Sequence, residues 1–147
     1  MLMSPAHGFD RYTAHGGPVR GLALSPDGST LVTASFDYSA VAWGTQTLDE
    51  QATLLGHEAA VNTAAFSADG SLLATAGDDG LVLLWTKEQI GDDDAKTVVL
   101  HGHKGKVVDL EFSRDGTMLA SASWDGSIGI WPLAETGLDK SQSARFI

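Results

Sequence analysis

The sequence predicts an all-β fold of three four-stranded antiparallel units that follow one another along the chain. The first observation is a repeat, because a histidine, an Asp-Gly pair, a second aspartate and a tryptophan recur three times at identical separations. The second is that short apolar runs alternate with turn sequences inside each copy. The third is the length of the repeat, about 40 residues, which is typical of β units that stack on one another. The histidines and tryptophans that bound the copies are His15 and Trp43, His57 and Trp85, and His103 and Trp131.

Each copy begins with a strand whose pattern requires an irregularity. The pattern is Val-x-x-apolar-x-apolar. A regular strand places alternate residues on one face, so a valine and its third neighbour share a face only if an extra residue lies between them. The pattern therefore predicts a β-bulge early in the strand. The residues of the pattern are Val19, Leu22 and Leu24, then Val61, Ala64 and Phe66, then Val107, Leu110 and Phe112.

A tight turn and three further strands complete each copy. The sequences SPDG, SADG and SRDG predict turns in which Asp-Gly supplies a positive φ, with the pairs beginning at Asp27, Asp69 and Asp115. We expect second strands at residues 30–35, 72–76 and 118–123, and third strands at 39–43, 81–85 and 127–131. Fourth strands are expected at 51–55, 96–100 and 141–147.

The connections between copies vary in length, whereas the copies do not. The extra residues of the second connection fall around Gly91–Lys96, which predicts a surface loop. We therefore expect repeat units at residues 14–55, 56–101 and 102–147. Residues 1–13 form an N-terminal segment, in which the stretch FDRYTA (Phe9 to Ala14) predicts an outer strand of a preceding or closing unit.

Four-stranded antiparallel units at this period are typical of β-propeller blades. With the features above in register, the chain resembles the WD40 repeat family over most of its length. It departs from the family at the dipeptide that names it, because the tryptophans are followed by Gly44, Thr86 and Pro132, and the first Gly-His has become Ala14-His15. The spacings are intact, so the resemblance implies three WD40-type blades in an incomplete ring.

The resemblance also implies a buried hydrogen-bonded tetrad of histidine, hydroxyl residue, aspartate and tryptophan in each blade. Indole N–H can only donate and carboxylate can only accept, whereas hydroxyl and imidazole can do both. A chain in the order Trp, hydroxyl, His, Asp therefore satisfies every member and stiffens the blade. The expected tetrads are His15, Thr33, Asp37 and Trp43; His57, Thr75, Asp79 and Trp85; and His103, Ser121, Asp125 and Trp131.

A catalytic triad is the alternative interpretation of Ser, His and Asp side chains that lie together. Recurrence in all three copies favours the structural interpretation, since an active site is rarely repeated once per blade. The sequence has no cysteine, and it contains no Gly-rich phosphate loop, G-x-S-x-G or HExxH motif. His101 and His103 form the one close histidine pair and lack a Cys or carboxylate cluster at ligand spacing. We expect no enzyme activity, no cofactor and no metal site.

Charge and hydropathy limit the partners. The net charge of −10 argues against nucleic acid and against an anionic membrane surface, since both favour a basic face. No apolar stretch approaches the length of a membrane span, and the N-terminus lacks the features of a secretory signal. We therefore expect a soluble, cytoplasmic protein.

The loops that carry the tetrad histidines and aspartates should form one rim, the top face of a propeller. The residue before each tetrad aspartate should protrude there, and two of the three, Phe36 and Trp124, are large aromatics, whereas the third is Asp78. Exposed aromatics beside charges are typical of interaction hot spots, although these two rings could instead pack against a neighbouring blade. The other candidate binding residues near this rim are Arg20, Tyr38, Glu58, Asn62, Lys104 and Lys106.

These observations predict a non-catalytic scaffold that binds a protein or peptide through the top face. One alternative is the sensor or docking part of a larger enzyme or redox protein whose catalytic module is not in this chain. Another is a half-propeller that associates with itself. Propellers typically have four to eight blades, because each blade covers the apolar face of its neighbour. Three repeats leave two outer faces open, so we expect further blades from a longer chain or from a second copy.

Overall fold

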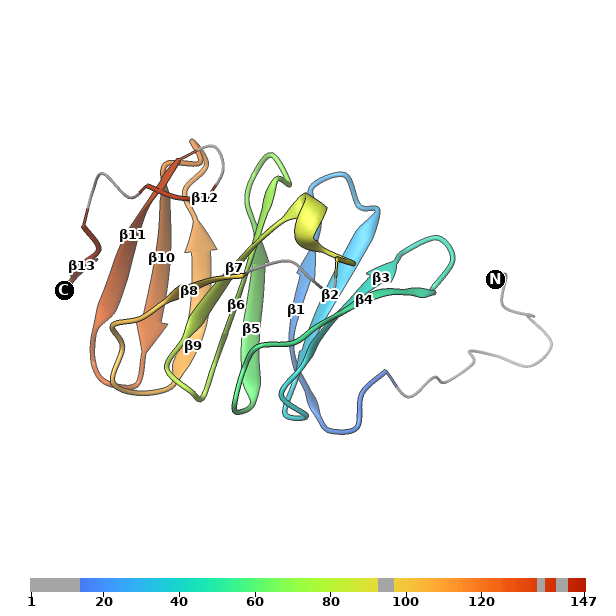
Figure 1. The fold of residues 1–147 in the computed structure, drawn as a ribbon, viewed down its shortest axis with the longest axis horizontal. Helices are drawn as coiled ribbons and strands as arrows, with labels where there is room; N and C mark the ends of the chain where they lie inside the picture. The colour runs from blue at the N-terminus through green and yellow to red at the C-terminus, as the bar shows by residue number, and fades with distance from the viewer. Residues whose placement is uncertain (1–13, 93–96, 135–136, 140–142) are drawn as a thin grey trace.

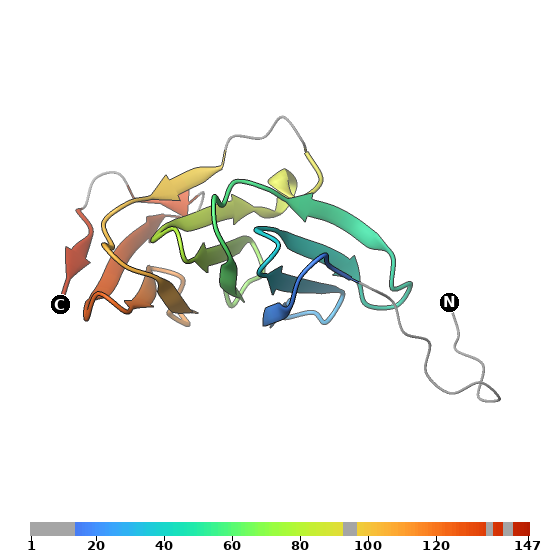
Figure 2. The same cartoon turned by 90° about the horizontal axis from the view of Figure 1, so that it is seen from below.

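Three antiparallel sheets follow one another along the chain and lie side by side in an open arc (Figure 1, Figure 2). The structure is a computed structural model, and it describes residues 14–92, 97–134, 137–139 and 143–147. That part of the chain contains no α-helix. We call the sheets blade 1, blade 2 and blade 3. The all-β fold and the incomplete ring that the repeat predicts are confirmed.

Each blade is a meander in which consecutive strands pair. Blade 1 contains β1 (Val19–Leu24), β2 (Thr30–Ser35), β3 (Ala40–Gly44) and β4 (Glu50–Leu54). Blade 2 contains β5 (Val61–Phe66), β6 (Leu72–Gly77), β7 (Val82–Thr86) and β8 (Val98–Leu100). Blade 3 contains β9 (Val107–Phe112), β10 (Met118–Ser123), β11 (Ile128–Ala134), β12 (Gly137–Leu138) and β13 (Arg145–Phe146).

Blade 3 and the connection after β7 differ from the expectation in detail. Blade 3 has a fifth strand, because β11 continues past its tryptophan and pairs with β12, while β13 pairs with the first part of β11. A short 3-10 helix, η2 (Lys87–Gln89), follows β7. The expected outer strand in FDRYTA lies outside the described residues except for Ala14, and most of the expected loop at Gly91–Lys96 does so too.

The predicted β-bulge is present in the first strand of every blade. In β1 the register advances from Val19 opposite Ser35 to Gly21 opposite Ala34, so Arg20 is the extra residue. The same shift makes Asn62 the extra residue of β5, and Val108 that of β9. A bulge turns its extra residue out of the regular ladder and bends the strand. One residue per blade is therefore displaced from the sheet at the same place.

The Asp-Gly turns at the other end of these strands are tied down by their own aspartates. Asp27 Oδ1 accepts hydrogen bonds from Ser25 Oγ, from Ser29 N and from Ser29 Oγ at 2.7–3.0 Å. Asp69 and Asp115 make the same three contacts in the turns of blades 2 and 3. The glycine that follows each aspartate has a φ of 74° or 75°, which a residue without Cβ adopts at no steric cost.

The core lies between the blades and consists of two clusters of buried side chains. We call the side of a blade that packs against the next blade its leading face, and the opposite side its trailing face. The first cluster joins the leading face of blade 1 to the trailing face of blade 2, with Val32, Ala40, Ala42 and Leu54 against Ala64, Leu73, Leu83 and Trp85. The second joins blade 2 to blade 3 in the same way, with Leu72, Ala74, Ala76, Val82, Leu84 and Leu100 against Val107, Leu110, Leu119, Trp131 and Leu133.

Blade 3 fills its tetrad region differently from the other two blades. Gly129 lies opposite Ser121, where blades 1 and 2 have Val41 and Leu83. A Cβ at Gly129 would lie 2.6 Å from Ser121 Oγ, so a larger residue there would displace the tetrad. Phe146 of β13 pairs with Gly129 and sets its ring edge-on to His103 and to Trp131, with centroids 5.3 and 5.4 Å apart. The phenylalanine thus supplies the apolar cover that the glycine lacks.

We expect Phe146→Ala to lower the free energy of unfolding by about 1–2 kcal/mol, less than for a fully buried ring because Phe146 is partly exposed. Val99→Ala changes the equivalent residue of β8, which lies opposite Leu83, and should cost less than about 1 kcal/mol. Urea unfolding of the two variants measures the difference. Equal losses would show that the ring does not cover the tetrad.

Candidate functional site

The three histidines lie in loops at one end of the blades, together with the aspartates that the sequence pairs with them. We define the histidine rim as residues 14–18, 35–39, 56–60, 77–81, 102–106 and 123–127, which lie along the lower edge of Figure 1. In blade 2, His57 Nδ1 lies 2.8 Å from Asp79 Oδ2, and His57 Nε2 lies 2.9 Å from Thr75 Oγ1. Trp85 Nε1 donates to the same hydroxyl at 3.2 Å. Four side chains thus form one chain from the rim loops through β6 to β7.

The structure brings together the four expected residues of the other two blades in the same order. In blade 1 the His–Asp, His–hydroxyl and Trp–hydroxyl distances are 2.9, 2.6 and 2.9 Å. In blade 3 they are 3.3, 2.7 and 2.9 Å. Trp85 and Trp131 are buried, whereas Trp43 is only half-buried because it lies on the uncovered trailing face of blade 1.

The donors and acceptors of each tetrad match in one direction. The indole N–H donates to the hydroxyl oxygen, so the hydroxyl hydrogen is free to donate to imidazole Nε2. Nδ1–H then donates to the carboxylate. Every buried side-chain nitrogen and oxygen among the described residues has a hydrogen-bond partner. Such a network is compatible with a low-dielectric interior and holds the rim loops to the sheet.

Two serines outside the predicted tetrads also contact the tetrad histidines and aspartates. Ser39 Oγ lies 3.2 Å from His15 Nδ1 and donates to Asp37 Oδ1 at 2.7 Å. Ser127 is placed in the same way beside His103 and Asp125. Blade 2 has Leu81 at this position and lacks the hydroxyl, although the backbone N–H of this residue donates to the aspartate in all three blades. The signal was present in the sequence, because the serine follows the tetrad aspartate by two residues in blades 1 and 3.

The tetrad aspartates also hold the loop that precedes the first strand. The backbone N–H after each histidine, in Gly16, Glu58 and Lys104, donates to the aspartate Oδ2 at 2.8–3.1 Å. Burial raises the pKa of Asp37, but hydrogen bonds from Ser39, His15 and Gly16 outweigh it and lower that pKa to about 2. The hydroxyl of Ser127 and the backbone N–H of Lys104 hold the pKa of Asp125 well below its usual range. These two carboxylates are therefore ionised at neutral pH.

Four of the candidate binding residues form one cluster across the seam between blades 2 and 3. Asn62 Nδ2 donates to Asp78 Oδ1 at 2.8 Å and to the carbonyl oxygen of Val107 at 3.0 Å. Lys106 Nζ donates to Asp78 Oδ2 at 2.8 Å and lies 5.4 Å from the ring centroid of Trp124. Trp124 is 73% exposed, so it does not pack against a neighbouring blade.

The remaining candidate residues lie elsewhere on the histidine rim. Phe36 and Tyr38 are exposed in the β2–β3 loop of blade 1, where Tyr38 has a positive φ of 73°. The backbone N–H of Phe36 donates to the carbonyl of Pro18, as those of Asp78 and Trp124 donate to Ala60 and Lys106. The three protruding residues are therefore held by the same backbone bond in each blade. Arg20, Glu58 and Lys104 are also exposed.

A family model described as "WD domain, G-beta repeat" matches residues 9–43, 48–86 and 95–132, which is more than half of the chain. The chain belongs to the WD40 repeat family. The matched stretches end at or just after the tetrad tryptophans, so they divide the chain at different points from the units expected at 14–55, 56–101 and 102–147.

The crystal structure of the RRP9 WD40 repeats is similar, with a TM-score of 0.77 and 26% identity. The similarity covers 87% of this chain and 39% of that chain, so this chain spans about two fifths of its length. No curated protein matches the chain.

WD40 repeats generally mediate protein–protein interactions, and their propellers are typically non-catalytic. Among the described residues of this WD40 chain, no group of three or more His, Asp or Glu side chains is arranged to hold a metal ion. Within the same residues, no helix is long and apolar enough to cross a membrane.

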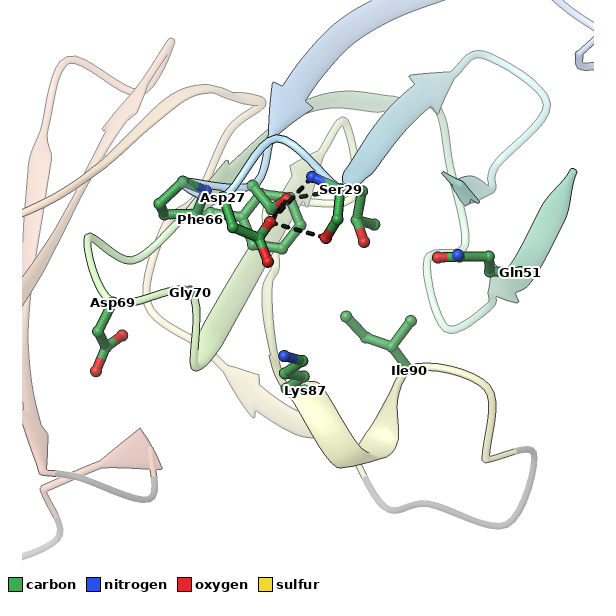
Figure 3. A pocket seen from close by; sticks show the side chains of 11 residues that line it. Asp27, Ser29, Gln51, Phe66, Asp69, Gly70, Lys87 and Ile90 are labelled. Carbon is green, nitrogen blue, oxygen red and sulfur yellow. Dashed lines mark hydrogen bonds between the residues drawn. The ribbon is translucent and has the colours of Figure 1, made fainter. Parts of the chain in front are cut away.

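A pocket of about 380 Å³ lies at the opposite end of the WD40 blades, between blades 1 and 2 (Figure 3). It is lined by the Asp27 and Asp69 turns, by Gln51 of β4, and by Lys87 and Ile90 from the connection after β7. Hydrogen bonds from the backbone of Ser29 and from the hydroxyls of Ser25 and Ser29 lower the pKa of Asp27 to about 2. The repeat spacing predicts a surface loop at Gly91–Lys96, and the residues between β7 and that loop form one wall of this pocket.

We expect Trp85→Ala to lower the free energy of unfolding by about 3–5 kcal/mol, because it removes a buried indole and leaves the Thr75 hydroxyl without its donor. Trp43→Ala is the matched control, since it breaks the same hydrogen bond at a half-buried position. It should cost about half as much. Denaturant unfolding of both variants tests this, and a melting temperature of Trp85→Ala within a degree or two of the parent would contradict the structural role of the tetrad.

Stability should fall in acid as Asp37 becomes protonated. Its pKa is depressed from 3.8 to about 2 in the folded state, so its contribution is complete above pH 4 and is lost as the pH falls toward 2. Asp37→Asn should cost about 1–2 kcal/mol at pH 7, part of it screened by solvent, and should flatten the acid dependence. Urea unfolding at pH 7 and at pH 3 measures both effects. Glu88→Gln, an exposed acid on η2, should change neither, and a parent-like acid slope in Asp37→Asn would contradict the assignment.

Proposed function

We propose that this chain is a non-catalytic WD40 interaction module that binds a protein or peptide segment on its histidine rim. The observation that carries the proposal is Trp124, a large aromatic side chain that is largely exposed beside Lys106, which is paired with Asp78. Tryptophan and charged residues at the centre of a contact are typical of binding hot spots.

The cluster around Trp124 is organised before any partner binds. Lys106 is held by Asp78, and Asp78 is held in turn by Asn62, which also spans to blade 3. Side chains that are already ordered lose little conformational entropy on association, so more of the contact energy appears as affinity. Both partners of Asp78 lower its pKa by hydrogen bonding, against the effect of burial, so the carboxylate is ionised and keeps Lys106 in place.

The tetrads support a structural role and not turnover. Each tetrad hydroxyl accepts a hydrogen bond from an indole N–H and lies buried, so it is not presented to a substrate. The same arrangement occurs in all three blades, as expected for a device that holds loops. A net charge of −10 supports a protein partner over nucleic acid, whose phosphates a basic surface would attract.

The proposal is tested with peptides selected from a random linear display library on the parent protein. Trp124→Ala should weaken the selected peptides about tenfold or more, as for a hot-spot residue, and leave the melting temperature unchanged. Leu48→Ala is the control, because Leu48 is an exposed apolar residue in the turn between β3 and β4, at the opposite rim. Peptides that ignore Trp124→Ala and respond to changes at the opposite rim would overturn the assignment of the binding face.

A further inference from the structure

Two blade faces in the described part of the chain lack the cover that every other blade face has. One is the trailing face of blade 1, where Val19, Leu22 and Leu24 are exposed. The other is the leading face of blade 3, where Met118, Ile128 and Ile147 are exposed. Six of the exposed large apolar side chains therefore lie on these two faces. Contiguous apolar surface of this kind marks an interaction site.

The register of the sheets shows that the equivalent positions of the trailing face are covered by a blade in the other two repeats. Leu22 pairs with the tetrad hydroxyl residue Thr33, as Ala64 pairs with Thr75 and Leu110 with Ser121. Leu22 is 66% exposed, whereas Ala64 and Leu110 are each 7% exposed because a preceding blade covers them. Leu22 therefore occupies a position that is buried in a seam between blades in the other two repeats.

The leading face of blade 3 has the same relation to blade 2. Ile128 pairs with Ala122, as Val82 pairs with Ala76 in blade 2. Ile128 is 45% exposed, whereas Val82 is fully buried under blade 3. The face also contains a hollow of about 210 Å³, lined among others by Met118, Ala120 and Ile130. At the seam between blades 2 and 3, Leu110 packs in one cluster with Ala74 and Ala76, the residues equivalent to Ala120 and Ala122.

We propose that two copies of this chain pair head to tail, with the leading face of blade 3 in each copy packed on the trailing face of blade 1 in the other. Both seams within the chain join a leading face to a trailing face, and the two open faces are one of each kind. A second copy supplies both missing covers at once and repeats an interface that the chain already makes twice. In this pairing Leu22 takes the place of Leu110, above Ala120 and Ala122.

In the proposed pairing a two-fold axis relates the copies, so the two seams between them are identical. Head-to-tail contacts form a ring when the rotation closes and a filament when it does not. Two three-bladed arcs joined at both ends give six blades, within the range of four to eight that propellers use. The result leaves the histidine rims of both copies on the same side of one ring, so it is independent of which partner those rims bind.

Light scattering coupled to size exclusion tests the pairing on the 147-residue chain. The parent should elute as a single species of twice 15.4 kDa across a dilution series in the micromolar range. Leu22→Glu and Ile128→Glu each change one exposed position and should each give a folded monomer. Leu48→Glu, the same kind of change on an exposed leucine outside both faces, should stay dimeric. Circular dichroism spectra matching the parent show that each variant is folded.

Mixing the two monomeric variants gives the decisive readout. A pair of one Leu22→Glu chain and one Ile128→Glu chain retains one intact seam, because the unchanged blade 3 face meets the unchanged blade 1 face. The mixture should therefore form a dimer that neither variant forms alone. A parent that stays at 15.4 kDa, a ladder of larger species, heterogeneous aggregates that need blades from another chain, or a mixture that stays monomeric would each overturn the proposal.

Discussion

Each blade of this protein has an apolar surface on both sides of one sheet, and the rest of the structure depends on how both sides are covered. Blade 2 is covered on both sides, and its Leu73, Leu83 and Val82 are almost inaccessible to solvent. The positions equivalent to Val61 and Ala64 become exposed in blade 1 as Val19 and Leu22, although the strands around them are unchanged. The repeat therefore encodes the sheet, and the neighbouring blade determines its burial. This is the expected behaviour of a chain whose stability is shared between units and the seams between them.

The tetrads hold the loops of the histidine rim, which have no apolar side to bury. The histidine and aspartate of each blade lie in different rim loops, and their hydrogen bonds join those loops to each other and to the tryptophan in the third strand. A buried polar chain of this kind stabilises only if every member is satisfied, since an unpaired buried donor or acceptor costs about 1–3 kcal/mol. The satisfied network explains why the same four residue types recur without exception while their neighbours vary.

The sequence could predict the features that every blade repeats, because their residues lie at fixed separations within one copy. Some features depend only on separations inside one copy: the strands, the bulge, the Asp-Gly turns and the twelve tetrad residues. Three copies with the same separations therefore predict them. The hydrogen bond from Asn62 to the carbonyl of Val107 joins two blades, so no spacing within a copy indicates it. The pairing of Phe146 with Gly129, strand β12 and the 3-10 helix Lys87–Gln89 each occur in a single blade. Exposure at Trp124 also required the structure, because a tryptophan before the tetrad aspartate is compatible with packing or with solvent.

The bulge links the requirements of the fold to those of recognition. It is needed so that the first strand can bury its valine together with the two apolar residues that follow, and it places one extra residue per blade beside the loop that precedes the tetrad aspartate. In blade 2 the two positions meet directly, since Asn62 donates to Asp78 at 2.8 Å. The corresponding pairs are Arg20 with Phe36 and Val108 with Trp124, so each blade carries a different combination at the same place. The backbone bonds and tetrads that hold these loops do not depend on the side chains at those two positions. Residues there can change from blade to blade without disturbing the sheet, and the binding surface that we propose is built on them.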